Sequence, residues 1–176
     1  MDLDKSVGTD FFARPVDVVA EDLIGRKLTV RDASCVRAGT IVETEAYGGP
    51  DDPASHAAFK PGGRAAVMWS WPGTIYVYAA YGVYPCLNLV TDAEGVASAV
   101  LIRGIHPDGE ENPIHGPGKT SRALKVTLDD HGIPWDCARF MVSSARKSLD
   151  IERTPRIGIS RGVEIPWRFI AQRNPR

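Results

Sequence analysis

The sequence has few cysteines and no long hydrophobic run. Its three cysteines, Cys35, Cys86 and Cys137, lie far apart and form no C-x-x-C pair. This spacing argues against a disulfide framework or a zinc site and favours a reducing compartment. The longest apolar runs, such as 97–102, are far shorter than the roughly 20 residues that a membrane span needs. The acidic start, residues 1–4, also lacks the basic region of a signal peptide. We therefore expect a soluble, cytoplasmic protein without a membrane partner.

An excess of one charge is also missing. The chain has 21 Lys and Arg against 22 Asp and Glu, which excludes a disordered polyelectrolyte and a strongly basic nucleic-acid-binding chain. With 43% hydrophobic residues it can form one core, so we expect a single domain over residues 1–176. The charge is nevertheless uneven, because residues 139–176 hold nine basic and three acidic residues. This basic segment is either a patch for phosphates or a solvated face.

Hydrophobic periodicity predicts one early helix followed mainly by strands. Pro15 suits a first helical turn, an apolar stripe follows it, and Gly25 can end the helix. The expected strands are 27–32, 40–47, 74–81, 83–90, 99–105, 156–160 and 167–172, with a loop at 108–118 and a short helix at 120–126. These elements predict a mixed α/β fold in which helices flank a curved antiparallel β-sheet and one β-hairpin protrudes.

Two carboxylates stand out in the expected strand 40–47. Alternation places Val42, Thr44 and Ala46 on one face, and Ile41, Glu43, Glu45 and Tyr47 on the other. The Cα atoms of the two glutamates would lie about 6.6 Å apart, so one charge would raise the pKa of the other carboxyl unless a cation lies between them. The alternative is a half-exposed strand with a solvated polar face.

Tyrosines are concentrated in one segment. Four of the five, Tyr76, Tyr78, Tyr81 and Tyr84, fall within nine positions. Tyr81 precedes Gly82 between two expected strands, which places it near the tip of a hairpin. An exposed aromatic ring there is typical of a wedge that enters a nucleic-acid stack, whereas cross-strand packing is the alternative.

Arg103 is the one charged residue in the apolar segment 99–105. Such a guanidinium is expected to turn inward and to need an anion, for which a strand carboxylate is the obvious partner. The alternative is an arginine that extends to water at the end of its strand.

Two further patterns concern metals and phosphates. His56 lies in a loop, and the other three histidines are scattered without metal-ligand spacing, so we expect no metal. The segment 116–121, GPGKTS, copies the end of a phosphate loop, but Pro113 stands where that motif needs glycine. A phosphate-loop ATPase is therefore a rival interpretation.

Taken together, these segments resemble the alkyladenine (3-methyladenine) DNA glycosylase family, the base-excision enzymes outside the helix-hairpin-helix group. The matching stretches are IVETEAYG at 41–48, ASH at 54–56, PGTIYVY at 72–78 with YG at 81–82, VLIR at 100–103, GPGK at 116–119 and RIGI at 156–159. They follow the family's order and cover the chain from about Phe11 to Phe169. The chain differs from the family pattern in its short acidic connection at 106–115, in the irregular stretch 59–64 and in Thr120.

The resemblance implies a role for each candidate residue. Glu45 would be the general base that activates water, and Arg103 and the Ile157 carbonyl would help to hold that water, while Glu43 would be structural. The flipped base would stack among Tyr47, His56 and Tyr78. The backbone amide of His56 would read its edge, Asn88 would limit which purines fit, and Tyr81 would fill the gap left in the duplex.

The function implied is that of a monofunctional purine DNA glycosylase. It would flip alkylated, and in some cases deaminated, purines out of double-stranded DNA and hydrolyse the N-glycosidic bond, leaving an abasic site. The resemblance further implies a monomer without metal or organic cofactor, at the nucleoid in a bacterium or in the nucleus of a eukaryote. A catalytically idle damage-binding protein is the alternative.

Overall fold

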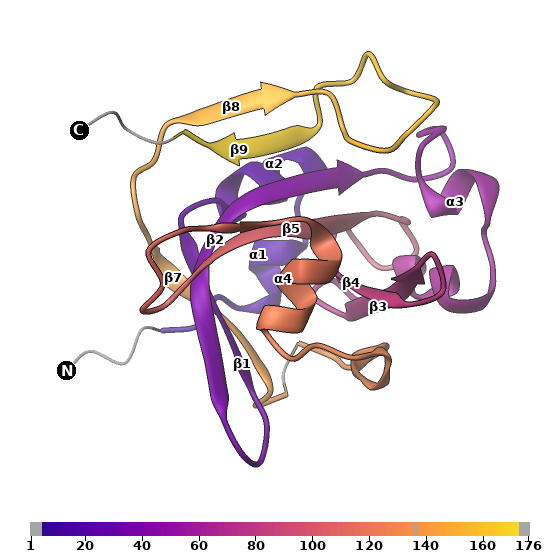
Figure 1. Ribbon diagram of the computed structural model, residues 1–176. Coiled ribbons are helices and arrows are strands. Elements are labelled where there is room, and N and C mark those ends of the chain that lie inside the picture. The colour runs from indigo at the N-terminus through magenta and orange to yellow at the C-terminus, as the bar shows by residue number, and fades with distance from the viewer. Residues whose placement is uncertain (1–4, 136, 173–176) are drawn as a thin grey trace.

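One large antiparallel sheet organises the computed structural model, which describes residues 5–135 and 137–172 (Figure 1). The strands are β1 (Arg26–Arg31), β2 (Val36–Tyr47), β3 (Ile75–Ala80), β4 (Tyr84–Val90), β5 (Ala99–Pro107), β6 (Ile114–His115), β7 (Phe140–Arg146), β8 (Ile151–Thr154) and β9 (Arg168–Ala171). The main order is β3-β4-β5-β2-β1-β7, while β6 pairs with β5 and β9 pairs with β2 and β8. The predicted mixed α/β fold with an antiparallel sheet is therefore confirmed.

The helices are short. They are α1 (Thr9–Phe12), α2 (Val16–Leu23), α3 (His56–Phe59) and α4 (Pro117–Ala123), with 3-10 helices at Gly63–Trp69 and Leu128–Asp130. In the part of the chain that the structure describes, no helix has the length and apolar content to cross a membrane. The acidic start, residues 1–4, lies outside the described residues.

Helix α2 packs its predicted apolar stripe on the sheet. Its buried residues are Val16, Val19, Ala20 and Leu23, and the Thr44 hydroxyl of β2 donates to the Ala20 carbonyl at 2.8 Å. Gly25 follows with a φ of +86°, and a Cβ there would come within 2.3 Å of the Lys147 carbonyl oxygen. Only glycine fits this approach, so the sequence signal for the helix end is correct.

Strand β2 carries an irregularity that the alternation rule did not predict. Its pairing with β5 shifts on either side of Glu43, and both Ile41 and Ala46 lie in the main hydrophobic core. Two residues separated by an odd number of positions share a face only when alternation is interrupted. The prediction that Ile41 shares a face with Glu43 and Glu45 is therefore wrong, because a β-bulge re-aims the residues between Ile41 and Thr44.

The C-terminal third differs most from the sequence expectation. The predicted strand 156–160 is an irregular loop, and the strand lies earlier, at β8. Strand β7, which pairs with β1, was not predicted. Helix α4 begins at Pro117 rather than at 120, since proline suits the first helical position, and β6 occupies the end of the expected loop 108–118.

Candidate active site

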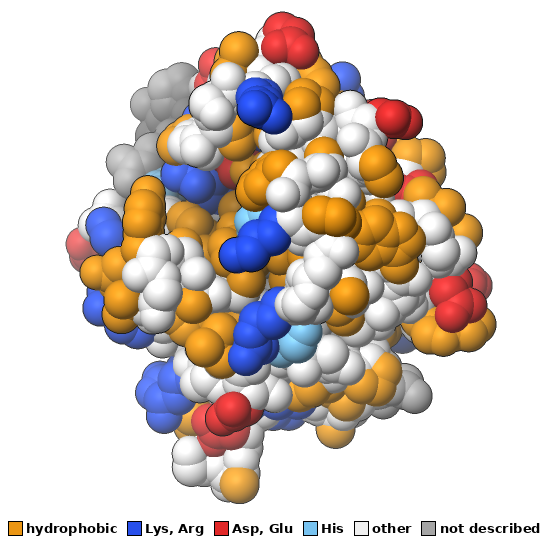
Figure 2. Space-filling model, turned by 90° about the vertical axis from the view of Figure 1, so that its right-hand side faces the viewer, with side chains coloured by type: hydrophobic (Ala, Val, Ile, Leu, Met, Phe, Trp, Pro, Cys, Tyr) orange, Lys and Arg blue, Asp and Glu red, His pale blue; other side chains and the backbone are white. Residues whose placement is uncertain are grey.

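A cavity of about 720 Å³ opens between the β3–β4 hairpin, α3 and the loop at 157–161. All eight predicted site residues line it: Glu45, Tyr47, His56, Tyr78, Tyr81, Asn88, Arg103 and Ile157. Figure 2 looks onto the side of the molecule that carries α3 and the loop between β8 and β9; hydrophobic side chains border a recess there, and basic side chains lie beside it. The structure thus brings residues from five separate segments to one site.

Glu45 lies on β2 at the base of this cavity and is fully buried. The Tyr47 hydroxyl donates to its Oε2 at 2.8 Å, and the Ile157 backbone amide donates to its Oε1 at 2.8 Å. Arg103 Nε lies 3.6 Å from the same Oε1. The two hydrogen bonds fix the carboxylate, and the Arg103 guanidinium supplies the positive charge that a buried anion requires. The observed bond of Ile157 is made by its amide, whereas the resemblance implies a role for its carbonyl.

Glu43 lies beside Glu45 and is only 1% exposed. Its Oε1 accepts from Arg103 Nε at 3.0 Å and from Arg168 Nε at 2.7 Å, while Oε2 lies 2.6 Å from His115 Nδ1. Burial alone would raise the pKa of Glu43. The hydrogen bonds from His115 and Arg168 and the charges of Arg168 and Arg103 outweigh burial and hold this pKa below its usual value. Glu43 is therefore a fixed anion.

Arg103 connects the two carboxylates, as an inward-facing arginine was predicted to do. Its side chain is 15% exposed. Its backbone carbonyl accepts from the Gly116 amide at 2.9 Å and from the Thr120 hydroxyl at 3.0 Å, so the start of α4 fixes this part of β5. Thr120 is fully buried and its hydroxyl donates to this carbonyl, so the hydroxyl cannot reach a phosphate or its metal ion. The GPGKTS segment is thus a support for Arg103, and the phosphate-loop interpretation fails.

Aromatic rings form one wall of the cavity. The ring centroids of His56 and Tyr78 lie 4.7 Å apart at 77°, and His56 Nδ1 lies 2.7 Å from the Tyr76 hydroxyl. Burial raises the pKa values of Tyr47 and Tyr78, so both hydroxyls keep their protons. Burial and the charge of Lys60 lower the pKa of His56. The wall is therefore uncharged at neutral pH.

Asn88 on β4 presents a defined polar atom to the cavity. Its Nδ2 donates to the carbonyls of Tyr76 at 3.1 Å and Cys86 at 3.0 Å. Because these bonds use both amide hydrogens, the polar atom left for a ligand is the acceptor Oδ1.

Tyr81 lies at the turn between β3 and β4 and is 94% exposed. Its φ is +51° and that of Gly82 is +73°, a pair of positive values typical of a tight hairpin turn. Because almost all of its side chain is exposed, the ring lies outside the core, and the packing alternative does not apply to it.

A buried ion pair, which the sequence did not predict, holds the loop over the site. Arg156 NH1 lies 2.6 Å from Asp52 Oδ2, and NH2 lies 2.8 Å from Oδ1. The guanidinium carbon also lies 4.9 Å from the centroid of the Tyr47 ring. Because Ile157 follows Arg156 directly, this pair brings the Ile157 amide to Glu45.

Sequence reasoning also missed His115 and Arg168 as partners of Glu43. A usable signal existed for Arg168, which is a charged residue inside an apolar strand, as Arg103 is. His115 gave none, because its contact depends on the pairing of β6 with β5. Among the described residues, no three His, Cys, Asp or Glu side chains gather in a way that could hold a metal ion.

Most of the arginines in residues 139–176 form ion pairs with carboxylates of the same chain. Five of its arginines pair with carboxylates: Arg139 with Asp130, Arg146 with Asp22, Arg153 with Glu21, Arg156 with Asp52 and Arg168 with Glu43. Arg173 and Arg176 lie outside the described residues. This segment thus contributes more to the fold than to a free phosphate-binding patch.

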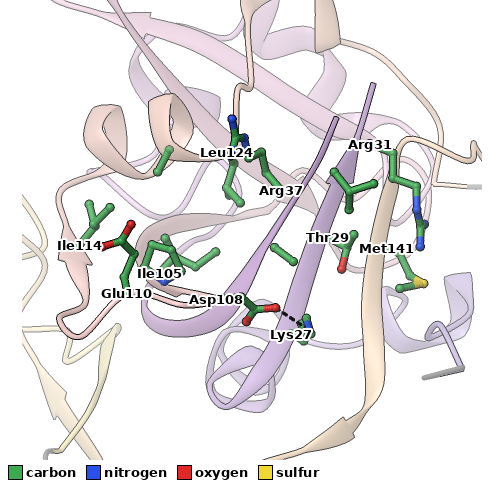
Figure 3. A pocket seen from close by; sticks show the side chains of 14 residues that line it. Lys27, Thr29, Arg31, Arg37, Ile105, Asp108, Glu110, Ile114, Leu124 and Met141 are labelled. Atoms are coloured by element: carbon green, nitrogen blue, oxygen red, sulfur yellow. Dashed lines mark ion pairs between the residues drawn. The ribbon is translucent and has the colours of Figure 1, made fainter. Parts of the chain in front are cut away.

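A second cavity, of about 590 Å³, lies against β1 and β2 (Figure 3). Lys27 Nζ and Asp108 Oδ2 form an ion pair at 2.5 Å on its wall. Apolar side chains such as Ile105 and Leu124 also line it. None of the predicted site residues is among those that line it, so the candidate site is the first cavity.

The geometry of this site points to a class of enzyme. Two buried carboxylates that share an arginine, beneath an aromatic recess, suit hydrolysis of a bond to a flat ring.

Comparison with known proteins names the family. The sequence pattern of methylpurine-DNA glycosylase (MPG) matches residues 10–175. Relatives named as 3-methyladenine DNA glycosylases include one from Rhodopseudomonas palustris (strain ATCC BAA-98 / CGA009), 41% identical over 90% of this chain and 81% of its own length. One from Prosthecochloris aestuarii is 40% identical over 94% and 88%, and one from Wolbachia sp. subsp. Brugia malayi is 43% identical over 91% and 94%. The chain belongs to the methylpurine-DNA glycosylase family, and it is a DNA glycosylase of DNA repair.

Proposed function

We propose that this DNA glycosylase removes alkylated purines, 3-methyladenine among them, by flipping the damaged nucleotide into the 720 Å³ cavity and hydrolysing its N-glycosidic bond. The observation that carries the proposal is the position of Glu45, a fully buried carboxylate at the base of an aromatic recess. The product is an intact strand with an abasic site. None of the described residues that line the cavity is a lysine, so no amine lies at hand to form a Schiff base with the sugar.

Glu45 acts as the general base. Its carboxylate accepts a proton from a water molecule, which attacks C1′ of the flipped nucleotide as the bond to the base breaks. Arg103 and the Ile157 backbone orient this water, and Arg103 also stabilises the negative charge of the site. Glu43 takes no part in proton transfer, because it does not line the cavity and its oxygens bind Arg103, Arg168 and His115.

The aromatic wall receives the base. Tyr47, His56 and Tyr78 offer ring surfaces on which a purine stacks, and such stacking is worth about 1–3 kcal/mol per base. Base extrusion costs a few kcal/mol and is least costly for damaged or mispaired bases. A cationic alkylated purine gains more than a neutral one from electron-rich rings, which favours alkylated bases over normal ones. Asn88 selects among purines through the fixed direction of its Oδ1 acceptor.

Tyr81 holds the duplex open. The ring stands at the tip of the β3–β4 hairpin, beside the mouth of the cavity, and fills the space that the flipped nucleotide leaves. A wedge of this kind lowers the rate at which the extruded base returns to the stack.

The direct test is base release. The protein is incubated with methylated duplex DNA, and the supernatant is analysed for free 3-methyladenine, with intact strands recovered until alkali is added. A catalytically idle damage-binding protein would retain the DNA and release no base, and that result would overturn the proposal. A panel of duplexes with single lesions, including 7-methylguanine and hypoxanthine, then defines the range of substrates.

A further inference from the structure

We propose that His115 is a positioning residue for catalysis: its hydrogen bond to Glu43 holds Arg103 in the place where it serves Glu45. The inference rests on the proposed function, because it concerns the same site. It assigns a role to a side chain that lies on the outside of the molecule and lines neither cavity.

The first observation is the way the donors divide between the two oxygens of Glu43. Arg103 Nε and Arg168 Nε both bind Oε1, at 3.0 and 2.7 Å. His115 Nδ1 is the partner of Oε2, at 2.6 Å. An ionised carboxylate only accepts, so Nδ1 carries the hydrogen and donates it. The hydrogen bond to Oε2 of Glu43 is therefore supplied by His115.

The second observation is that Arg103 lies between two competing carboxylates. Its Nε is 3.0 Å from Glu43 Oε1 and 3.6 Å from Glu45 Oε1, so a small rotation decides which carboxylate it serves. Glu43 is 1% exposed with His115 in place, so an apolar side chain of similar size at position 115 would leave Oε2 covered and without a donor. If His115 is replaced, Arg103 is the flexible donor that can form a hydrogen bond with Oε2. Forming this bond moves the guanidinium away from Glu45. Arg168 is less free to move, because its NH1 also lies 3.3 Å from the Thr154 hydroxyl.

The third observation is that the position of His115 is itself fixed. His115 pairs with Gly104 across the β5–β6 ladder, and a Cβ at Gly104 would lie 3.2 Å from His115 Nδ1 and 2.8 Å from Glu43 Cβ. Gly104 thus leaves room for the imidazole to approach Glu43. The side chain of His115 is 49% exposed, so its substitution removes little packing.

The test uses two amides of different length. The Nδ2 of asparagine stands near the position of an imidazole Nδ1, whereas the amide of glutamine is one methylene further from the backbone. We expect His115→Leu and His115→Gln to lower the single-turnover rate of base release by about 10- to 100-fold, the range for a catalytic group displaced by up to 1 Å. His115→Asn should restore most of the rate, and the Kd for lesion-containing duplex should change little in all three variants.

His106→Ala is the matched control. Within the described part of the chain, the one hydrogen bond of the His106 side chain joins its Nε2 to the Glu110 carbonyl and not to Glu43. The rate of base release by His106→Ala should equal that of the wild type. Circular dichroism melting checks that each variant folds. A wild-type rate in His115→Leu, or no recovery in a folded His115→Asn, would overturn the inference. Absence of base release by the wild-type protein would instead overturn the proposed function.

Discussion

The ion pair of Asp52 and Arg156 links the stability of the fold to the geometry of the site. Both side chains are almost completely buried, and the two terminal nitrogens of the Arg156 guanidinium each meet a separate oxygen of the Asp52 carboxylate. Asp52 also accepts from the amides of Gly48 and Ala54. Asp52→Ala would leave a buried guanidinium without its anion, a change that costs about 3–5 kcal/mol.

In a chain of this size each kcal/mol lowers Tm by about 2–4 °C, so we expect a decrease of about 6–20 °C in thermal unfolding followed by circular dichroism. Asp108→Ala is the matched control, because Asp108 pairs with Lys27 on the surface and both side chains are at least two-fifths exposed. That substitution should cost about 0–1 kcal/mol. Equal losses in the two variants would refute the claim that burial decides the contribution of this pair.

The dependence of stability on pH provides a second test of the role of Asp52. Burial raises the pKa of Asp52, but the hydrogen bonds from Arg156, Gly48 and Ala54 lower it further, so the folded-state pKa lies below the usual value. A depressed pKa stabilises the fold at pH values above about 4, and this contribution is lost as pH falls through the folded-state pKa. The stability difference between the wild type and Asp52→Ala should therefore be full at neutral pH and shrink in acid. A difference that stays constant down to pH values of about 2 would contradict this.

Two further predictions concern DNA and pH. Tyr81→Ser should weaken capture of a lesion in duplex DNA by about 1–3 kcal/mol and leave base release from a single strand unchanged. Binding and single-turnover assays on both substrates measure this, and equal losses on both would contradict the wedge role. Cationic 7-methylguanine leaves without a proton, whereas neutral hypoxanthine must gain one, so only the hypoxanthine rate should fall in alkali, where the proton donor is lost. Identical pH profiles for the two lesions would show that protonation of the leaving group does not limit the reaction.

The sequence predicted those parts of the site that depend on local periodicity. Glu43 and Glu45 share one side of β2 because strand alternation has a period of two, and Arg103 turns inward because its neighbours are apolar. The bulge between Ile41 and Thr44 was not predicted, because nothing in the sequence of β2 marks the position at which its pairing with β5 shifts.

Contacts between distant segments could not be predicted in this way. Asp52 and Arg156 are 104 residues apart, and no periodic pattern relates them. The alternating Ile157 and Ile159 favoured a strand at 156–160, but the segment follows the buried Arg156 side chain and leaves Ile157 exposed. Strand β7 does carry a local signal, because Phe140 and Val142 alternate into the core.

The central claim, that Glu45 is the general base, is tested most directly by comparing Glu45→Gln with Glu43→Gln in single-turnover release of 3-methyladenine from duplex DNA. Glutamine keeps the shape of each side chain but cannot accept the proton of the attacking water. We expect Glu45→Gln to bind lesion-containing DNA normally and to lose about 100- to 10,000-fold in rate, with a smaller loss for Glu43→Gln. A rate close to that of the wild type in Glu45→Gln, or a larger loss in Glu43→Gln, would contradict the assignment.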